Sequence, residues 1–276
     1  MSVDEARTVW VDRLGMRYRA PVRPAGLRAA LRSVVRREYR EIDAVTDLTF
    51  GLAAGEVVGF LGPNGAGKTT TMKILAGILH PTSGDVRVLG SVPWQRRRSY
   101  LRTIALIRGS QPIGGPAELT VMDSLRYQQL LYEVPREDFR TAVDELVDLL
   151  DISALLPRQV RALSLGERMR AGLAMAMVYR PKVLFLDEPT LGLDVSAAAT
   201  LRRFVAEYAA RTGATILLTS HYMADVEALC RRVILIDHGR IRYDGDLGAL
   251  SMTLAPDLVD PALDVVLDRL YRDGAR

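Results

Sequence analysis

The residues best suited to chemistry lie at 62–70, where three glycines precede a lysine and two threonines. The run Gly62-Pro63-Asn64-Gly65-Ala66-Gly67-Lys68-Thr69-Thr70 fits the pattern G-x-x-x-x-G-K-[ST] of phosphate-binding loops. Its glycines let the backbone turn N–H groups inward, which makes a concave anion site at the positive end of the following helix. Lys68 would reach the β- and γ-phosphates, and the Thr69 hydroxyl would bind Mg²⁺. The pattern predicts a nucleoside triphosphate site; the alternative is a glycine-rich turn with Lys68 at the surface.

The residues around this loop predict the strand and the helix that it needs. The apolar run 57–61 precedes the loop, and a helix-like segment follows at 70–79. This order is the setting in which the motif binds phosphate, because the helix N-terminus must face the loop. The context therefore favours the nucleotide site over a simple turn.

Two carboxylates end a second apolar strand. Residues 183–186 are apolar, and Asp187 and Glu188 follow them directly. In phosphate-loop ATPases an acidic residue at a strand end holds Mg²⁺ through water, a role that suits Asp187. Glu188 can polarise the attacking water as a general base. Adjacent acids can also begin a solvated loop, but the phosphate loop elsewhere in the chain favours the catalytic interpretation.

Elsewhere the chain alternates between strand and helix patterns. Strand patterns are absent from 120–179, where helical periodicity takes over. The order predicts an α/β fold, with a parallel sheet flanked by helices and interrupted by a helical insertion. We expect strands at 9–18, 44–50, 85–89, 104–107, 183–186, 215–219 and 233–237, and helices at 197–211 and 223–229.

Four further motifs follow in a fixed order. Leu163-Ser164-Leu165-Gly166-Glu167 resembles the LSGGQ signature of ATP-binding cassette (ABC) proteins and lies just upstream of the acidic strand. Gln111 matches the glutamine of the family's Q-loop, Gly192-Leu193-Asp194 its D-loop, and His221 its switch histidine. The resemblance covers about residues 9–250. It is strongest to the ATPase subunits of bacterial exporters that are encoded apart from their membrane subunits, and it implies a phosphate-loop NTPase core with an added antiparallel β subdomain.

The resemblance also implies roles for these residues. Two cassettes would share each ATP, with the phosphate loop of one facing the signature of the other. Ser164 and Gly166 open a helix, so the signature would offer a hydroxyl and backbone N–H groups to the γ-phosphate. Gln111 would join Thr69 and Asp187 in binding Mg²⁺. His221 would hold the γ-phosphate and position water, as a second catalytic residue beside Glu188, and Asp194 would link the two sites across the dimer.

The signature departs from the family pattern at two positions. Leu165 stands where glycine is usual, and Glu167 stands where glutamine is usual. Leu165 removes some backbone freedom, whereas Glu167 adds negative charge near the γ-phosphate unless its side chain points away. We expect an active ATPase, with these positions affecting its rate.

An aromatic side chain at the end of the first strand stacks on adenine in this family. Tyr18 ends the first strand pattern, whereas Tyr39 has the usual spacing to the next strand at Ala44 and Val45. We favour Tyr18 for adenine and expect Tyr39 to be a packing residue.

A basic segment separates these tyrosines. Residues 13–40 hold nine arginines against the single acidic residue Glu38. Within 25–39, apolar residues recur on one helical face beside Arg28, Arg32 and Arg36. Such a helix suits peripheral contact with anionic headgroups or with an acidic partner. The equal alternative is a solvated helix packed on the edge of the sheet.

The bulk composition is that of a globular protein. The 276 residues are 49% hydrophobic and 25% charged, with a net charge of +4. No apolar run approaches the ~20 residues of a membrane span, and the lone Cys230 fits a reducing compartment as a small buried residue. We expect an ABC ATPase domain at 1–255, with the basic insertion at about 20–42 and a helical subdomain at about 118–180, and a C-terminal helical tail at 256–276.

Together these features predict a peripheral ATPase subunit at the cytoplasmic face of the inner (plasma) membrane. It would power export through a separate permease, paired with a second copy of itself or a paralogous cassette, and nucleic acid is not an expected partner. The alternative is a soluble ABC ATPase of DNA repair or translation. Repair-type members need a long coiled coil, for which the sustained heptads are lacking, and translation-type members carry two sets of motifs. A phosphate-loop kinase would lack the signature, the D-loop and the switch histidine.

Overall fold

A six-stranded sheet forms the centre of the molecule. The computed structural model describes residues 7–21, 39–109, 116–254 and 265, with only the backbone of 251–254. Within these residues the strand order is β5-β6-β7-β3-β8-β9. The first five strands are parallel, and β9 pairs antiparallel with β8. The strands are β3 (Val57–Leu61), β5 (Ile104–Arg108), β6 (Val183–Asp187), β7 (Thr215–Thr219), β8 (Arg232–Asp237) and β9 (Arg240–Asp246).

A smaller antiparallel sheet lies beside it, with the order β2-β1-β4. Its strands are β1 (Arg7–Pro21), β2 (Tyr39–Ala53) and β4 (Ser83–Val88). Apolar residues of β1 alternate toward a shared core, among them Val9 and Val11, which are fully buried. This core also contains Phe60 of β3 and Met72 of the helix after the phosphate loop, so the small sheet is packed directly against the nucleotide-binding segment.

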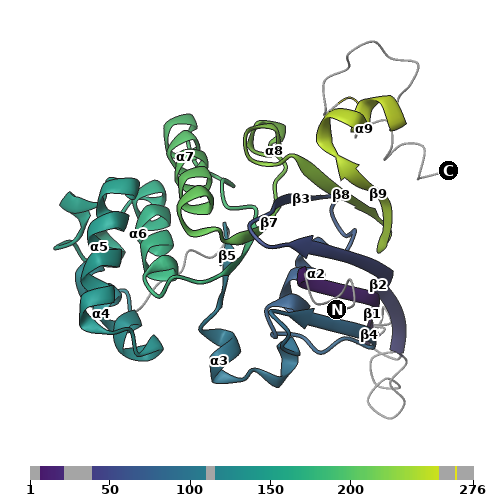
Figure 1. Ribbon diagram of the computed structural model, residues 1–276, viewed down its shortest axis with the longest axis horizontal. Coiled ribbons are helices and arrows are strands. Elements are labelled where there is room, and N and C mark those ends of the chain that lie inside the picture. The colour runs from purple at the N-terminus through teal and green to yellow at the C-terminus, as the bar shows by residue number, and fades with distance from the viewer. Residues whose placement is uncertain (1–6, 22–38, 110–115, 255–264, 266–276) are drawn as a thin grey trace, which may run out of the picture.

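Three helices gather at the end of the molecule away from the small sheet (Figure 1). They are α4 (Val121–Tyr132), α5 (Arg136–Leu150) and α6 (Leu165–Met177). The helices α2 (Lys68–Leu75), α7 (Val195–Thr212) and α8 (Met223–Leu229) follow strands of the central sheet. The short elements are α3 (Arg98–Leu101), α9 (Leu247–Leu254) and the 3₁₀ turns Pro93–Gln95, Ser153–Leu155 and Val160–Ala162.

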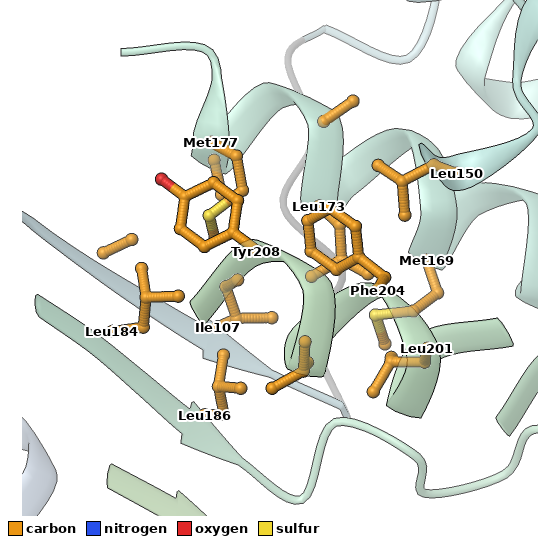
Figure 2. Packing of buried hydrophobic residues seen from close by; sticks show 14 of the residues in the cluster. Ile107, Leu150, Met169, Leu173, Met177, Leu184, Leu186, Leu201, Phe204 and Tyr208 are labelled. Atoms are coloured by element: carbon orange, nitrogen blue, oxygen red, sulfur yellow. The ribbon is translucent and has the colours of Figure 1, made fainter. Parts of the chain in front are cut away.

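One hydrophobic cluster joins the three helices to the central sheet. Met169, Leu173 and Met177 follow one face of α6 and lie among side chains of α7 and of the strands (Figure 2). Phe204 and Tyr208 of α7 belong to the same cluster. Burying a side chain of this size contributes roughly 1.5–3 kcal/mol, so this packing holds the signature helix α6 at a fixed place relative to the sheet.

The sequence analysis predicted the fold class correctly, and the alternation of strands and helices is confirmed. Two details differ. The first strand continues to Pro21 and the second begins at Tyr39, with Ala20 paired to Arg40, so the outer residues of the expected insertion at 20–42 form a strand hairpin. The strand β9 and the helix α9 were missed, because β9 is half exposed and carries only a weak apolar pattern.

Some sequence predictions fall on residues outside the described part of the chain. These are most of the basic helix at 25–39, the Q-loop residue Gln111, and the tail at 256–276 apart from Val265. Among the helices that the structure does describe, none combines the length and apolar character that crossing a bilayer requires.

Candidate ATP-binding and catalytic site

The phosphate loop lies between β3 and α2, and its backbone needs glycine at two close approaches. Gly67 has a φ of 104°, and a Cβ there would collide with the Ala44 carbonyl oxygen. At Gly62 a Cβ would collide with the Ile236 carbonyl oxygen. Both contacts are with backbone atoms of strands, which are fixed by their own pairing. The loop is therefore closely packed between β2 and β8 at the N-terminus of α2.

Lys68 is the first residue of α2 and is folded over the loop. Its ammonium donates hydrogen bonds to the carbonyl oxygen of Gly62 and, at 3.0 Å, to that of Pro63. The side chain is buried, and burial lowers the pKa of Lys68, while the carboxylates of Glu188 and Asp187 oppose this shift. The cation therefore points back over the concave loop, the place where phosphate oxygens would replace the carbonyls.

Asp187 connects three segments at the end of β6. Its Oδ2 accepts a hydrogen bond from Thr69 Oγ1 at 2.9 Å, and its Oδ1 accepts one from Thr219 Oγ1 at 2.9 Å. The side chain of Asp187 is almost fully buried. A carboxylate beside a hydroxyl is an all-oxygen donor set of the kind that Mg²⁺ takes in nucleotide sites, so the residues present fit this cation.

Glu188 is held in a constrained backbone position next to His221. Its φ is 53°, in the left-handed region, and its N–H donates to the Thr219 carbonyl oxygen at 3.1 Å. A Cβ at Gly109, just past β5, would collide with the Glu188 carbonyl oxygen, so only glycine fits there. Glu188 Oε1 lies 2.9 Å from His221 Nε2. A left-handed non-glycine residue at such a place is typical of strain kept at functional sites.

The signature residues lie at the N-terminus of α6 and form a capping box. Ser164 Oγ accepts from the Glu167 N–H at 3.3 Å, and Glu167 Oε2 accepts from the Ser164 N–H at 2.8 Å. Glu167 Oε1 also accepts from Arg158 Nη1 at 2.6 Å. The carboxylate of Glu167 is thus turned back onto its own helix end. Leu165 is 45% exposed, and Gly166 fits against Ala197 of α7.

The remaining predicted residues lie around this centre. Asp194 caps α7 by accepting from the Ala197 N–H at 2.8 Å. The Tyr18 hydroxyl lies 3.4 Å from Thr70 Oγ1 of α2, which brings its ring beside the helix that follows the loop. Tyr39 lies at the far end of the hairpin, opposite Pro21. Of the two tyrosines, Tyr18 is the one that the fold brings to the phosphate loop.

A buried acidic residue, Asp225 of α8, was not found by the sequence analysis. Its carboxylate accepts from Thr190 Oγ1 at 2.5 Å, from Ser220 Oγ at 2.7 Å and from Arg202 Nη1 at 2.8 Å. Thr190 follows Glu188 by two residues and Ser220 precedes His221, so Asp225 fixes both segments that carry these side chains. No motif marks Asp225 in the sequence, because Thr190 and Arg202 come from distant segments and only Ser220 is close to it along the chain.

The family of this chain follows from comparison with known proteins. A family model described as ABC transporter matches residues 45–191. The chain belongs to the ABC transporter family. It is 33% identical over 209 residues to the ABC transporter ATP-binding protein NatA of Bacillus subtilis, a match that covers 76% of this chain and 84% of NatA. As an ATP-binding subunit of this family, the chain is an ATPase, which confirms the predicted activity.

Two relatives have names that refer to transport or export. The chain is 32% identical to the bacitracin transport ATP-binding protein BcrA of Bacillus licheniformis, over 74% of this chain and 65% of that protein. It is 35% identical to the Nod factor export ATP-binding protein I of Paraburkholderia xenovorans, over 78% of this chain and 70% of that protein.

Solved structures share the same fold. One, an ATP-binding subunit of an ABC transporter, has a TM-score of 0.77 at 25% identity and covers 96% of this chain and 99% of its own. Another is a dimeric ATP-binding cassette bound to ADP and Pi in a post-hydrolysis state. It has a TM-score of 0.70 at 19% identity, covering 87% of this chain and 98% of its own.

Replacing Lys68 should weaken ATP binding strongly. Lys68→Ala removes the cation that the loop holds over the phosphate position. Hydrogen bonds to charged groups contribute roughly 1.5–3 kcal/mol each, so the Kd for Mg-ATP should rise by about ten- to a hundredfold. Calorimetric titration measures this, with Lys73→Ala in the last turn of α2 as the matched control. An unchanged Kd for Lys68→Ala would contradict the assignment of the loop.

Replacing Asp225 should destabilise the fold. Asp225→Ala leaves the Arg202 guanidinium partly buried without its carboxylate and leaves the Thr190 hydroxyl without its acceptor, while Ser220 keeps only its longer bond to the Tyr222 carbonyl oxygen. Breaking a buried pair in this way costs about 3–5 kcal/mol. The free energy of unfolding from urea titration should fall accordingly, whereas the exposed Glu227→Ala on the same helix should change it little. An unchanged midpoint for Asp225→Ala would show that this cluster does not stabilise the fold.

Proposed function

We propose that this chain powers export through a separate membrane permease, working as one of two cassettes bound head to tail. The observation that carries this proposal is that the predicted ATP-site residues lie in two separate groups on different elements of the chain. The phosphate loop, Asp187 and Glu188 lie together, whereas the signature turn at Ser164 opens a different helix at the surface. The export and transport names of the relatives support the permease as the partner.

An exposed apolar patch beside the signature supports the second cassette. Leu165, Leu191 and Val195 are 45%, 41% and 84% exposed. The start of α6 lies against the segment that carries Leu191 and Val195, since a Cβ at Gly192 would lie 3.4 Å from Leu165 Cδ2 and one at Gly166 would lie 3.4 Å from Ala197 Cβ. Exposed apolar clusters of this kind favour protein contact. The patch therefore gives the proposed dimer an apolar contact next to the residues that would reach the partner's ATP.

Within the proposed dimer, different residues of the chain would bind the phosphates, adenine, Mg²⁺ and the attacking water. Lys68 and the loop N–H groups would bind the β- and γ-phosphates, and Tyr18 would stack on adenine. Thr69, Asp187 and Gln111 would hold Mg²⁺, which when bound neutralises charge that develops on the phosphate oxygens. Glu188 would accept a proton from the attacking water.

The remaining roles fall to groups beside Glu188 and on the second cassette. His221, whose Nε2 lies against Glu188, would orient the water and hold the γ-phosphate. Ser164 and Gly166 of the second cassette would complete the γ-phosphate site, since the first turn of α6 and the positive end of its dipole lie there. Asp194, which begins α7 beside the apolar patch, would link the two sites.

The permease would dock on α4. Tyr127, Leu130 and Leu131 are spaced so that they share one face of α4, and they are 47%, 76% and 52% exposed. Since α4 follows the Q-loop in sequence, we propose that the same partner also contacts Gln111. We place the subunit at the cytoplasmic face of the membrane, with the basic segment at 25–39 as a further contact with anionic lipid.

Glu188→Gln should bind ATP but lose hydrolysis, because the amide keeps the shape of the carboxylate while it cannot accept the proton. General base catalysis contributes typically about 10²–10⁴-fold, so turnover should fall by that order. The variant should accumulate as an ATP-bound dimer, visible by light scattering after size exclusion. Turnover close to that of the wild type would move the catalytic role to another group, with His221 the next candidate.

Placing a charge on the α4 face should uncouple the subunit. Leu130→Arg should reduce the amount of native membrane partner that copurifies with the chain, because a charge cannot be buried in an apolar contact without cost. ATP hydrolysis by the detached subunit should change little, since Leu130 is not among the residues assigned to ATP or Mg²⁺. Thr141→Arg on the exposed face of α5 is the control. Copurification unaffected by Leu130→Arg would exclude this face as the docking site.

A further inference from the structure

Arg158 holds the signature turn through two contacts. Its Nη1 donates to Glu167 Oε1 at 2.6 Å, and its Nη2 donates to the Ala162 carbonyl oxygen at 2.8 Å. Ala162 lies two residues before Ser164, and Glu167 lies three residues after it. One guanidinium therefore spans the signature from both sides, in the forked geometry that arginine provides and lysine does not.

Glu167 is ionised in this arrangement. The Ser164 backbone N–H and, next, the Arg158 guanidinium hold the pKa of the Glu167 carboxyl below its usual value. A bare carboxylate at the N-terminus of α6 would occupy the same positive helix end that an incoming γ-phosphate needs. Arg158 places a compensating positive charge directly on that carboxylate.

The capping box also sets the direction of the Ser164 hydroxyl. Because Ser164 Oγ already accepts from the Glu167 N–H, its own proton remains available to donate. The bond from the Glu167 N–H also fixes where Ser164 Oγ lies at the end of α6, and Arg158 holds the side chain of that same residue.

We propose that Arg158 is a positioning residue of the shared ATP site, which neutralises Glu167 and fixes the signature turn so that the second cassette can close on the γ-phosphate. This inference rests on the proposed head-to-tail dimer. It assigns a specific function to the Glu167 departure from the family signature: the acid caps the helix, and Arg158 removes the charge penalty that the acid would otherwise bring to the phosphate.

The test is a double-mutant cycle on ATP-driven dimerisation in a Glu188→Gln background. Arg158→Ala is made with Glu167 in place and again with Glu167→Gln, since glutamine retains the capping box without the charge. Sedimentation velocity gives the dimer dissociation constant in saturating Mg-ATP, and calorimetry gives the ATP affinity of the monomer. Arg158→Ala should weaken the dimer by about tenfold when Glu167 is present and by less than about twofold when it is combined with Glu167→Gln. The ATP affinity of the monomer should not change.

Two further variants separate charge from packing. Arg161→Ala is the matched control, since Arg161 lies in the same turn and its side chain contacts Gln159 rather than Glu167. It should leave the dimer constant unchanged. Arg158→Lys keeps the charge but loses the fork, so it should weaken the dimer less than Arg158→Ala does.

Each contrary outcome is informative. Equal weakening of the dimer by Arg158→Ala in both backgrounds would show that Arg158 only supports the local fold, and no weakening in either would show that it has no role; both overturn the inference. If the Glu188→Gln parent itself stayed monomeric in Mg-ATP, the dimer and this inference would fall together. A parent that dimerises while the cycle shows no coupling would overturn the inference alone.

Discussion

The carboxylate of Asp187 is the point where separate parts of the site are held together. It ends β6 almost out of contact with solvent, and the hydroxyls of Thr69 and Thr219 both donate to it. Burying a carboxylate without donors would cost several kcal/mol, so these bonds tie α2 and β7 to the end of β6. Glu188 follows directly, with its backbone held by Thr219 and closely packed against Gly109. The position of the candidate base therefore depends on the parallel register of β5, β6 and β7.

The other half of the chemistry lies on a different part of the chain. The helix α6 is fixed by its apolar face against α7 and the sheet, and its N-terminus with Ser164 is left at the surface. Capping by Glu167 and the contact from Arg158 order this end without any partner. The signature turn is therefore ordered, and Arg158 neutralises the charge of Glu167. Such a turn can bind the γ-phosphate of an ATP held by another chain, which is why we assign the second cassette to this face.

How much could be predicted from sequence depends on whether the contacts are local. The phosphate loop is a run of consecutive residues whose pattern predicts one backbone conformation, so roles for Lys68 and Thr69 could be predicted directly. The carboxylates at the end of β6 follow from a strand pattern. The cluster around Asp225 could not be found, because its partners Thr190 and Arg202 lie on segments that only the tertiary fold brings to α8. The direction of Glu167 was also open, since Arg158 lies nine residues away and no periodicity relates the two.

The most direct test of the shared site is a crosslink between the phosphate loop of one chain and the signature of another. Asn64→Cys and Leu165→Cys would be made in separate chains and mixed; both positions are exposed, whereas the native Cys230 is buried, which raises the pKa of its thiol to about 12 and keeps it unreactive. Under mild oxidation with ATP, the account predicts a disulfide between the two chains that neither variant forms alone and that is lost without nucleotide. A mixture that stays uncrosslinked with ATP, or crosslinks equally without it, would contradict the head-to-tail arrangement.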